Sequence, residues 1–308
     1  MPYGGRVPHL PPGSERTDEA SGAPGTPDGA AGDAVAAAER AGVVVRTLHS
    51  HADLDGARRL WDTVWPSPTS ATEVTANHLR AIEHAGGYVA GAFDGSVMVG
   101  AALAFVGRSR TPDGFRTHLH SHMAAVLPVA ADRGVGTALK LHQRAWALVH
   151  GIDRVVWTFD PLVRRNARLN LTKLGGVAVE YLVDFYGPMD DPHNVGEPSD
   201  RLLLAWDLAS PRVAAALAGT APALPAAAWA QRGAERVLDD VDGPRRRGTS
   251  APLQLVALPA DIVAQRHDDP ARAAAWRAAV RDLLAPALDA GGSVGALTAE
   301  GDYVLAVG

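Results

Sequence analysis

The stretch Ala131-Asp132-Arg133-Gly134-Val135-Gly136-Thr137-Ala138-Leu139 lies between a predicted strand and a long predicted helix. Its two glycines let the backbone approach a ligand closely, and the N–H groups at a helix start attract anions. Arg133 adds a positive charge and Thr137 adds a hydroxyl. The stretch therefore predicts a phosphate-binding loop, with an ordinary helix start as the alternative.

The spacing excludes two commoner phosphate loops. No Lys-Ser or Lys-Thr pair follows the second glycine, as a Walker loop requires. No third glycine with an acidic residue about 20 positions later completes a dinucleotide-binding fingerprint.

Outward from the loop, hydrophobic periodicity predicts the order β-α-α-β-β-β-α-β-α-β-β over residues 43–209. Asp94-Gly95 indicates a tight hairpin, and Gly107–Gly114 is expected as a polar loop. The expected strands are Val43–Leu48, Tyr88–Phe93, Val97–Phe105, Thr117–Val126, Arg154–Phe159, Val177–Asp184 and Arg201–Leu208.

The remaining segments are expected to play smaller parts. Residues 1–40 have almost no large apolar side chains, so they are interpreted as a disordered tail. Residues 210–250 are rich in Ala, Pro and Gly and are interpreted as a linker, with a helix around Ala226–Val237. Residues 251–308 predict a small α/β module that is too small for a sizeable core and should pack on the first domain.

The bulk composition restricts the class of protein. The 308 residues carry a net charge of −5, which gives no general attraction to nucleic acid or anionic membranes. The absence of cysteine excludes disulfides, thiolate metal sites and cysteine nucleophiles. No apolar run approaches the ~20 residues of a membrane span, and no secretory signal is seen, so a cytoplasmic location is expected.

Lysine is almost absent, and only Lys140 and Lys173 occur. One interpretation is that these two positions need a compact ammonium group rather than a planar guanidinium. The other is a bias in coding composition.

Together the motifs resemble those of the GNAT superfamily of acyl-CoA N-acyltransferases. The resemblance is carried by Val126-x-Pro128, by Arg133-Gly134-Val135-Gly136-Thr137-Ala138-Leu139, and by Asn166 followed by Lys173-Leu174-Gly175. It covers about half of the chain, and other stretches look like a little-characterised branch with a C-terminal extension. It implies a GNAT-like α/β fold, a mixed and mostly antiparallel sheet flanked by helices, followed by the small C-terminal module.

The resemblance also implies roles for individual residues. Backbone groups of Ala124 and Val126 would bind the pantetheine arm of acetyl-CoA or another acyl-CoA, and Asn166 would lie near this co-substrate. The pyrophosphate would be bound by the amides of Arg133, Gly134, Val135, Gly136 and Thr137.

Two positions depart from the family pattern. Ala131 stands where relatives often have Gln or Arg, which leaves the pyrophosphate to backbone amides and Arg133. Leu171 stands where relatives have a Tyr that protonates the leaving thiolate, so the proton donor is open between Tyr181, Tyr186 and water.

Three histidines alternate along one predicted strand and should share a face: His118, His120 and His122. The family often has a catalytic base at the position of His120, which makes it the first candidate and His122 the second. A neutral imidazole suits this role near pH 7. The alternatives are a metal site with Asp160 or Glu180 as third ligand, and, for His118 above all, a structural role.

The expected activity is acyl transfer by direct attack of an amine on the thioester, with acetyl as the default acyl group and succinyl as an option. Asp160 and Arg201 are the candidate substrate contacts. Arg201, or Arg164 or Arg165, could bind a carboxylate, and the alternative is that these arginines are solvated surface charges. The expected partner is a small-molecule amine or amino acid, without metal, nucleic acid or membrane, and a homodimer stays open. The alternatives are a histidine-ligated metal enzyme and a non-catalytic CoA-binding regulatory protein.

Overall fold

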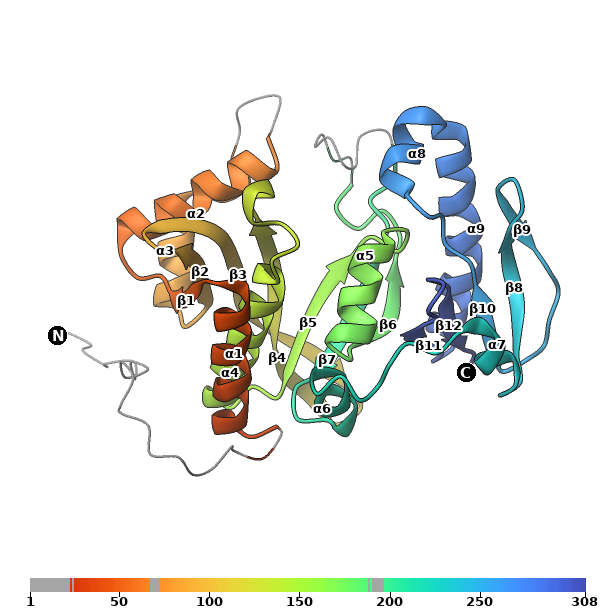
Figure 1. Cartoon of the computed structure of the whole chain (residues 1–308), viewed down its shortest axis with the longest axis horizontal. Helices are drawn as coiled ribbons and strands as arrows, with labels where there is room; N and C mark the ends of the chain where they lie inside the picture. The colour runs from red at the N-terminus through yellow and green to blue at the C-terminus, as the bar shows by residue number, and fades with distance from the viewer. Residues whose placement is uncertain (1–22, 24, 67–71, 188, 190–196) are drawn as a thin grey trace.

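The computed structural model describes residues 23, 25–66, 72–187, 189 and 197–308. Within these residues, the strands form one sheet with the order β1-β2-β3-β4-β5-β7-β6-β11-β12-β10-β8-β9 (Figure 1). They are β1 (Val44–Thr47), β2 (Tyr88–Asp94), β3 (Val97–Thr111), β4 (Gly114–Val126), β5 (Arg154–Phe159), β6 (Val177–Leu182), β7 (Arg201–Asp207), β8 (Ala234–Asp240), β9 (Pro244–Arg246), β10 (Leu253–Val256), β11 (Ser293–Leu297) and β12 (Tyr303–Ala306).

Helices accompany the sheet along its whole length. They are α1 (Pro27–Ala41), α2 (His51–Val64), α3 (Ala76–His84), α4 (Val135–Val149), α5 (Arg164–Ala167), α6 (Pro211–Leu217), α7 (Ala226–Ala230), α8 (Ile262–Asp268) and α9 (Pro270–Asp289), with a π-helix at Arg168–Lys173. No helix of the described part is both long and apolar enough to cross a membrane.

The first seven strands form the unit expected over residues 43–209. All their pairs are antiparallel except β4 with β5. The predicted fold class, a mixed and mostly antiparallel sheet flanked by helices, is therefore confirmed. The loop expected at Gly107–Gly114 is wrong, because β3 and β4 continue as a paired hairpin until Thr111 faces Gly114. Its residues are mostly exposed, and an exposed hairpin needs no apolar alternation.

The two faces of this unit bury separate apolar clusters. One cluster joins α1 and α4 to residues such as Leu119 and Trp157, and it continues into the C-terminal part. The other joins α2 and α3 to residues such as Leu103 and Met123. The strands β4 and β5 lie between these layers, so an opening between them is bordered by helices on both faces.

The disordered tail predicted for residues 1–40 is wrong for Pro27–Ala41, which forms α1. Alanines at helical spacing let α1 pack closely on α4. Thr26 caps the helix start, and Asp33 forms an ion pair with Arg144 (2.9 Å). Small side chains gave no strong periodic signal, which is why composition misled the prediction. Residues 1–22 and 24 lie outside the described residues.

The linker predicted for residues 210–250 is also wrong. It contains α6, α7, β8 and β9, and the helix expected at Ala226–Val237 ends at Ala230 before β8 begins. The C-terminal module thus begins before residue 251. Its strands continue the main sheet, because β11 pairs with β6, and α8 and α9 stand beyond β6 in Figure 1.

Candidate functional site

The central feature is a separation of two neighbouring strands. β4 and β5 pair only at Leu119 with Val155 and at His120 with Val156. Beyond these positions each strand continues along its outer neighbour, β3 or β7, without pairing with the other. The inner edges of both strands therefore keep backbone groups for a ligand.

The register of β4 shows which residues offer those groups. Leu127 N–H donates to the carbonyl oxygen of Val99 in β3 (2.9 Å). The β3 residue that follows Val99 faces Val126. Because backbone directions alternate along an antiparallel strand, the N–H and C=O of Val126 and Ala124 face the opening. These are the residues predicted to bind a pantetheine arm, and an extended chain could add to this edge as a strand would.

The glycine loop lies beside this edge. Gly134 directly precedes α4 as its N-cap residue, with φ of +90°, a conformation that favours glycine, and no side chain caps the helix. The first helical bond is Ala138 N–H to Gly134 oxygen, so the preceding amides in the first turn have no partner inside the helix. A Cβ atom on Gly136 would meet only Val126, at 4.0 Å, which leaves open space between loop and strand.

Arg133 points to a different part of the molecule. Its guanidinium donates to Asp94 in β2 (2.8 Å) and to the carbonyl oxygen of Ala41 at the end of α1 (3.3 Å). Its charge is therefore shared with a carboxylate. The positive potential at the loop therefore comes mainly from the first-turn amides of α4.

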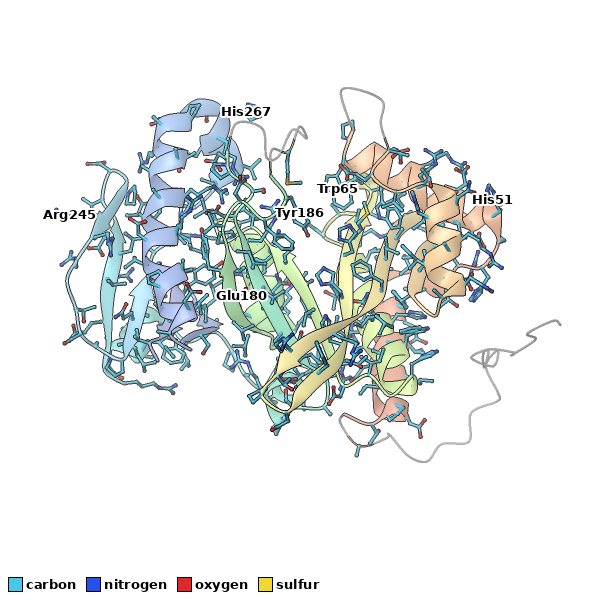
Figure 2. All side chains as sticks on the ribbon, turned by 180° about the vertical axis from the view of Figure 1, so that it is seen from behind. His51, Trp65, Glu180, Tyr186, Arg245 and His267 are labelled. Atoms are coloured by element: carbon cyan, nitrogen blue, oxygen red, sulfur yellow. The ribbon has the colours of Figure 1, made fainter. Side chains whose placement is uncertain are left out.

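A cavity of about 420 Å³ occupies the opening. This volume is in the range of small-ligand sites. In Figure 2, Trp65 at the end of α2 and Tyr186 lie near this part of the molecule. The cavity is lined by Val64, Trp65, Ser121, His122, Ala124, Ala125, Val126, Lys140, Trp157, Thr158, Phe159, Asp160, Val163, Arg165, Asn166, Leu169, Asn170, Arg201, Val263 and Arg266.

His120 and His122 lie together beside the opening. A register shift makes His122 an extra residue of β4, a β-bulge that redirects side chains. The His120 ring stacks on Phe105 (5.0 Å between centroids) and lies 6.2 Å from the His122 ring. Burial, with smaller effects of His122, His118 and Lys140, lowers the pKa of His120 to about 4. The ring is therefore neutral at pH 7.

His118 is placed differently. It is buried, hydrogen-bonded to Ser109 (3.1 Å), and covered so closely by Gly107 that a Cβ atom there would lie 2.6 Å from its ring. These contacts favour the structural interpretation for His118.

Asp160 lies at the cavity wall but is held by the C-terminal module. Its carboxylate forms salt bridges with Arg266 (2.6 Å) and Arg277 (3.1 Å), and both arginines also form salt bridges with Glu197. Burial raises the pKa of Asp160, but the charges of Arg277 and Arg266 outweigh it and hold the pKa below its usual range. We call these four residues the buried ion cluster.

The other predicted contacts also reach the cavity. Asn166 lines it from α5, and Arg201 lines it from β7 while donating to the carbonyl oxygen of Asp200 (2.8 Å). Burial lowers the pKa of Arg201. The sequence did not single out Arg266 or Val263 of α8, whose positions depend on how the C-terminal module packs.

The candidates for a proton donor differ in position. Leu171 is buried in the core, and Tyr181 is buried with its hydroxyl on Asp200 (2.7 Å). Neither lines the cavity. Tyr186 is hydrogen-bonded to Thr158 (3.0 Å), a cavity residue, and lies 6.5 Å from the His122 ring.

Lys140 is a cavity residue for which the sequence suggested no role beyond its rarity. It lies on α4, is 8% exposed, and bonds Ser121 Oγ at 2.8 Å. Its Nζ lies 3.8 Å from the centroid of the Trp157 ring. Only the lack of other lysines could have drawn attention to it.

A metal site at His120 and His122 would need a third ligand. Among the residues that the structure describes, no three His, Cys, Asp or Glu side chains are arranged to hold a metal ion. Asp160 belongs to the buried ion cluster, and Glu180 lies exposed on β6 (Figure 2).

Comparison with known proteins gives structural matches only. No family model matches the chain, and no curated protein does. The solved structures that it resembles include the ribosomal-protein-S18-alanine N-acetyltransferase of Escherichia coli, with 15% identity over 55% of this chain and 95% of that one, at a TM-score of 0.43. A GNAT-family acetyltransferase of Streptococcus pneumoniae has 14% identity over 53% and 98%, at 0.42. An N-acetyltransferase of Staphylococcus aureus has 15% identity over 54% and 98%, at 0.43.

Proposed function

We propose that the chain transfers an acyl group from acyl-CoA to the amine of a small molecule. The observation that carries the proposal is the separation of β4 from β5 beside an uncapped, glycine-containing start of α4. The strand edge at Ala124 and Val126 would bind the pantetheine arm, and the first-turn amides of α4 would bind the pyrophosphate. Bound there, acyl-CoA would supply an activated thioester.

The residues of the chain would then hold the amine against the thioester. Positioning of this kind can make a large contribution to the rate. His120, neutral at pH 7, would accept the proton of the amine, directly or through a water molecule. Backbone N–H groups at the free edge of β4 would polarise the carbonyl.

We further propose an amino acid as the acceptor. The four charges of the buried ion cluster balance one another, while Lys140 and Arg165 add positive charge to the cavity wall. A surplus of positive charge favours a carboxylate on the acceptor or on the acyl group. Acetyl is the default acyl group, and succinyl is the anionic option.

The test follows release of free thiol from acetyl-, succinyl- and propionyl-CoA across a panel of amino acids and simple amines. We expect turnover with an acceptor that carries a carboxylate and a lower rate with its amide. CoA binding without turnover for any pair would identify a CoA-binding protein that is not an enzyme.

A matched pair of variants tests the loop. Gly136→Val fills the space beside Val126 and should raise the Kd for CoA at least tenfold, since the pyrophosphate would lose its approach to the amides. Gly248→Val is the control, because Gly248 has open space around it and lies outside the site. Equal affinities in the two variants would contradict the loop assignment.

A further inference from the structure

Lys140 lies where the two strands begin to separate. Its Nζ contacts Ser121 and Trp157, which are the first residues after the last paired positions of β4 and β5. The side chain therefore reaches from α4 to the apex of the opening, and it lines the cavity there.

The charge of Lys140 has no counter-ion in the described part of the chain. No carboxylate there lies within ion-pair distance of its Nζ. Nζ contacts Ser121 and Trp157, and it lies 3.5 Å from Gln143 Oε1. A buried ammonium group without a carboxylate is costly, so this site favours either a neutral amine or an incoming negative charge. Burial accordingly lowers the pKa of Lys140 to about 7.

The groups around Lys140 leave its charge available to the cavity. From its own helix, Arg144 is directed to Leu208 and Asp33. On β4, His120 is the titratable group that interacts with it, and His120 is neutral at pH 7. Of the charged residues in the same cavity, Asp160 is bound by its own arginines.

Lys140 and His120 approach the apex from opposite faces of the sheet. Ser121 turns its hydroxyl to Lys140 on the α4 face, and adjacent strand residues point to opposite faces. His120 thus lies on the other face, stacked on Phe105. This arrangement offers a proton acceptor on one face and a proton donor on the other.

We propose that Lys140 is the proton donor to the sulfur atom that leaves during acyl transfer. The inference rests on the proposed function. As the C–N bond forms, the amine loses a proton to His120; as the C–S bond breaks, sulfur keeps the electron pair and takes a proton from Lys140 Nζ. Solvent exchange then restores both side chains, so that the net products are an amide and a free thiol.

Tyr186 is the competing donor, and its position favours Lys140. Its ring lies near that of His122, on the side of the opening where the amine would arrive. It is also 39% exposed, whereas Lys140 is buried at the apex. The variant Tyr186→Phe is therefore the matched comparison for Lys140→Met, in which a neutral side chain of similar length replaces the ammonium group.

The experiment measures kcat from pH 5 to 9 for the wild type and both variants. An ammonium donor works while it is protonated, so wild-type kcat should fall as the pH rises above about 7. Lys140→Met should have a kcat about 10²-fold lower than the wild type at pH 6.5, and its kcat should not fall above pH 7. Tyr186→Phe should show the same fall as the wild type, with a kcat within about threefold of it. An active wild type with an unchanged Lys140→Met profile would overturn the proposal, as would an acyl group found on Lys140 by mass spectrometry.

A binding measurement separates this proposal from the proposed function. The wild type should bind CoA at least tenfold more tightly than desulfo-CoA at pH 8.5. Lys140 is mostly a neutral amine at that pH, so it can take the proton of the thiol and pair with the resulting thiolate. Lys140→Met should bind both equally. Equal wild-type affinities for the two ligands would overturn the role of Lys140 and leave the proposed function standing. Failure to bind either ligand would contradict the proposed function and the Lys140 role together.

Discussion

His120 shows how a single residue is prepared by its surroundings. Burial and the nearby His122, His118 and Lys140 disfavour its protonated form. The ring is therefore ready to accept a proton across the neutral range, although a low pKa also makes it a weaker base than a free imidazole. Its place at the last paired position of β4, where the two strands begin to separate, makes it useful rather than its basicity.

His120→Gln should lower kcat about 10²-fold, and His122→Gln should have a smaller effect. The wild-type kcat/KM, expressed per unprotonated amine, should stay level from pH 7 down to about 5, because His120 takes up a proton only as the pH falls through about 4. Steady-state rates measured between pH 4 and 8 test this. An acid limb near 6.5, the ordinary histidine value, would show that another group acts as the base.

Some residue roles could be predicted from the sequence, and others depend on the tertiary fold. The histidines could be found because alternation along a strand fixes a shared face. The partner of Arg133 could not, because Asp94 and Ala41 approach it only after β2 and α1 are in place. The role of Lys140 could not be predicted either, because its orientation toward the opening depends on how α4 packs against the sheet.

At the scale of elements, the buried ion cluster joins β5 to the C-terminal module. Asp160 follows β5, Arg266 belongs to α8 and Arg277 to α9, and Glu197 completes the balance of two positive and two negative charges. Two members of the cluster, Asp160 and Arg266, line the cavity. Removal of the cluster should therefore disturb the module and the site together.

Asp160→Asn should lower the free energy of unfolding by on the order of 3 kcal/mol, because two buried arginines would share one remaining carboxylate. Adding Arg277→Met should recover part of that loss, since the two residues interact directly. Denaturant titrations of both variants measure this. Asp153→Asn is the control: Asp153 pairs with Arg116 at an exposed position, and its loss should cost less than about 1 kcal/mol. Equal losses at the two positions would contradict the cluster as a buried contact.

Elements rich in β-branched and large apolar residues were predictable, and those built from alanine were not. The strands Tyr88–Asp94 and Arg154–Phe159 lie close to their expected bounds. The helix at Pro27–Ala41 was missed because each alanine buries little surface. The bulge at His122 was missed because it arises from pairing with β3.

At the scale of the whole molecule, one sheet and one continuous apolar cluster cross the boundary that the sequence suggested. Buried residues from both parts, such as Leu204 and Trp276, belong to the same cluster. Hydrogen bonds also cross this boundary. Tyr303 donates to the carbonyl oxygen of Pro161 (2.8 Å), and Arg212 donates to the carbonyl oxygen of Gly175 (2.9 Å). The C-terminal module is therefore a structural part of the site-bearing domain.

A chain shortened to residues 1–209 should not fold cooperatively. It would lose β11 from the edge of β6 and α9 from its face, and each large apolar side chain uncovered costs about 2 kcal/mol. A few such losses approach the whole stability of a typical domain, roughly 5–15 kcal/mol. Circular dichroism should show no sharp thermal transition, and CoA should not bind.

Co-expression of residues 1–209 with residues 210–308 provides the control, because it restores every contact except the covalent connection. The two pieces should copurify and regain a cooperative transition, since their interface is a protein core rather than a surface contact. If residues 1–209 alone gave a sharp transition and bound CoA with the affinity of the full chain, the module would not be needed for folding or for binding CoA. The cavity wall formed by Val263 and Arg266 would then be dispensable for binding CoA.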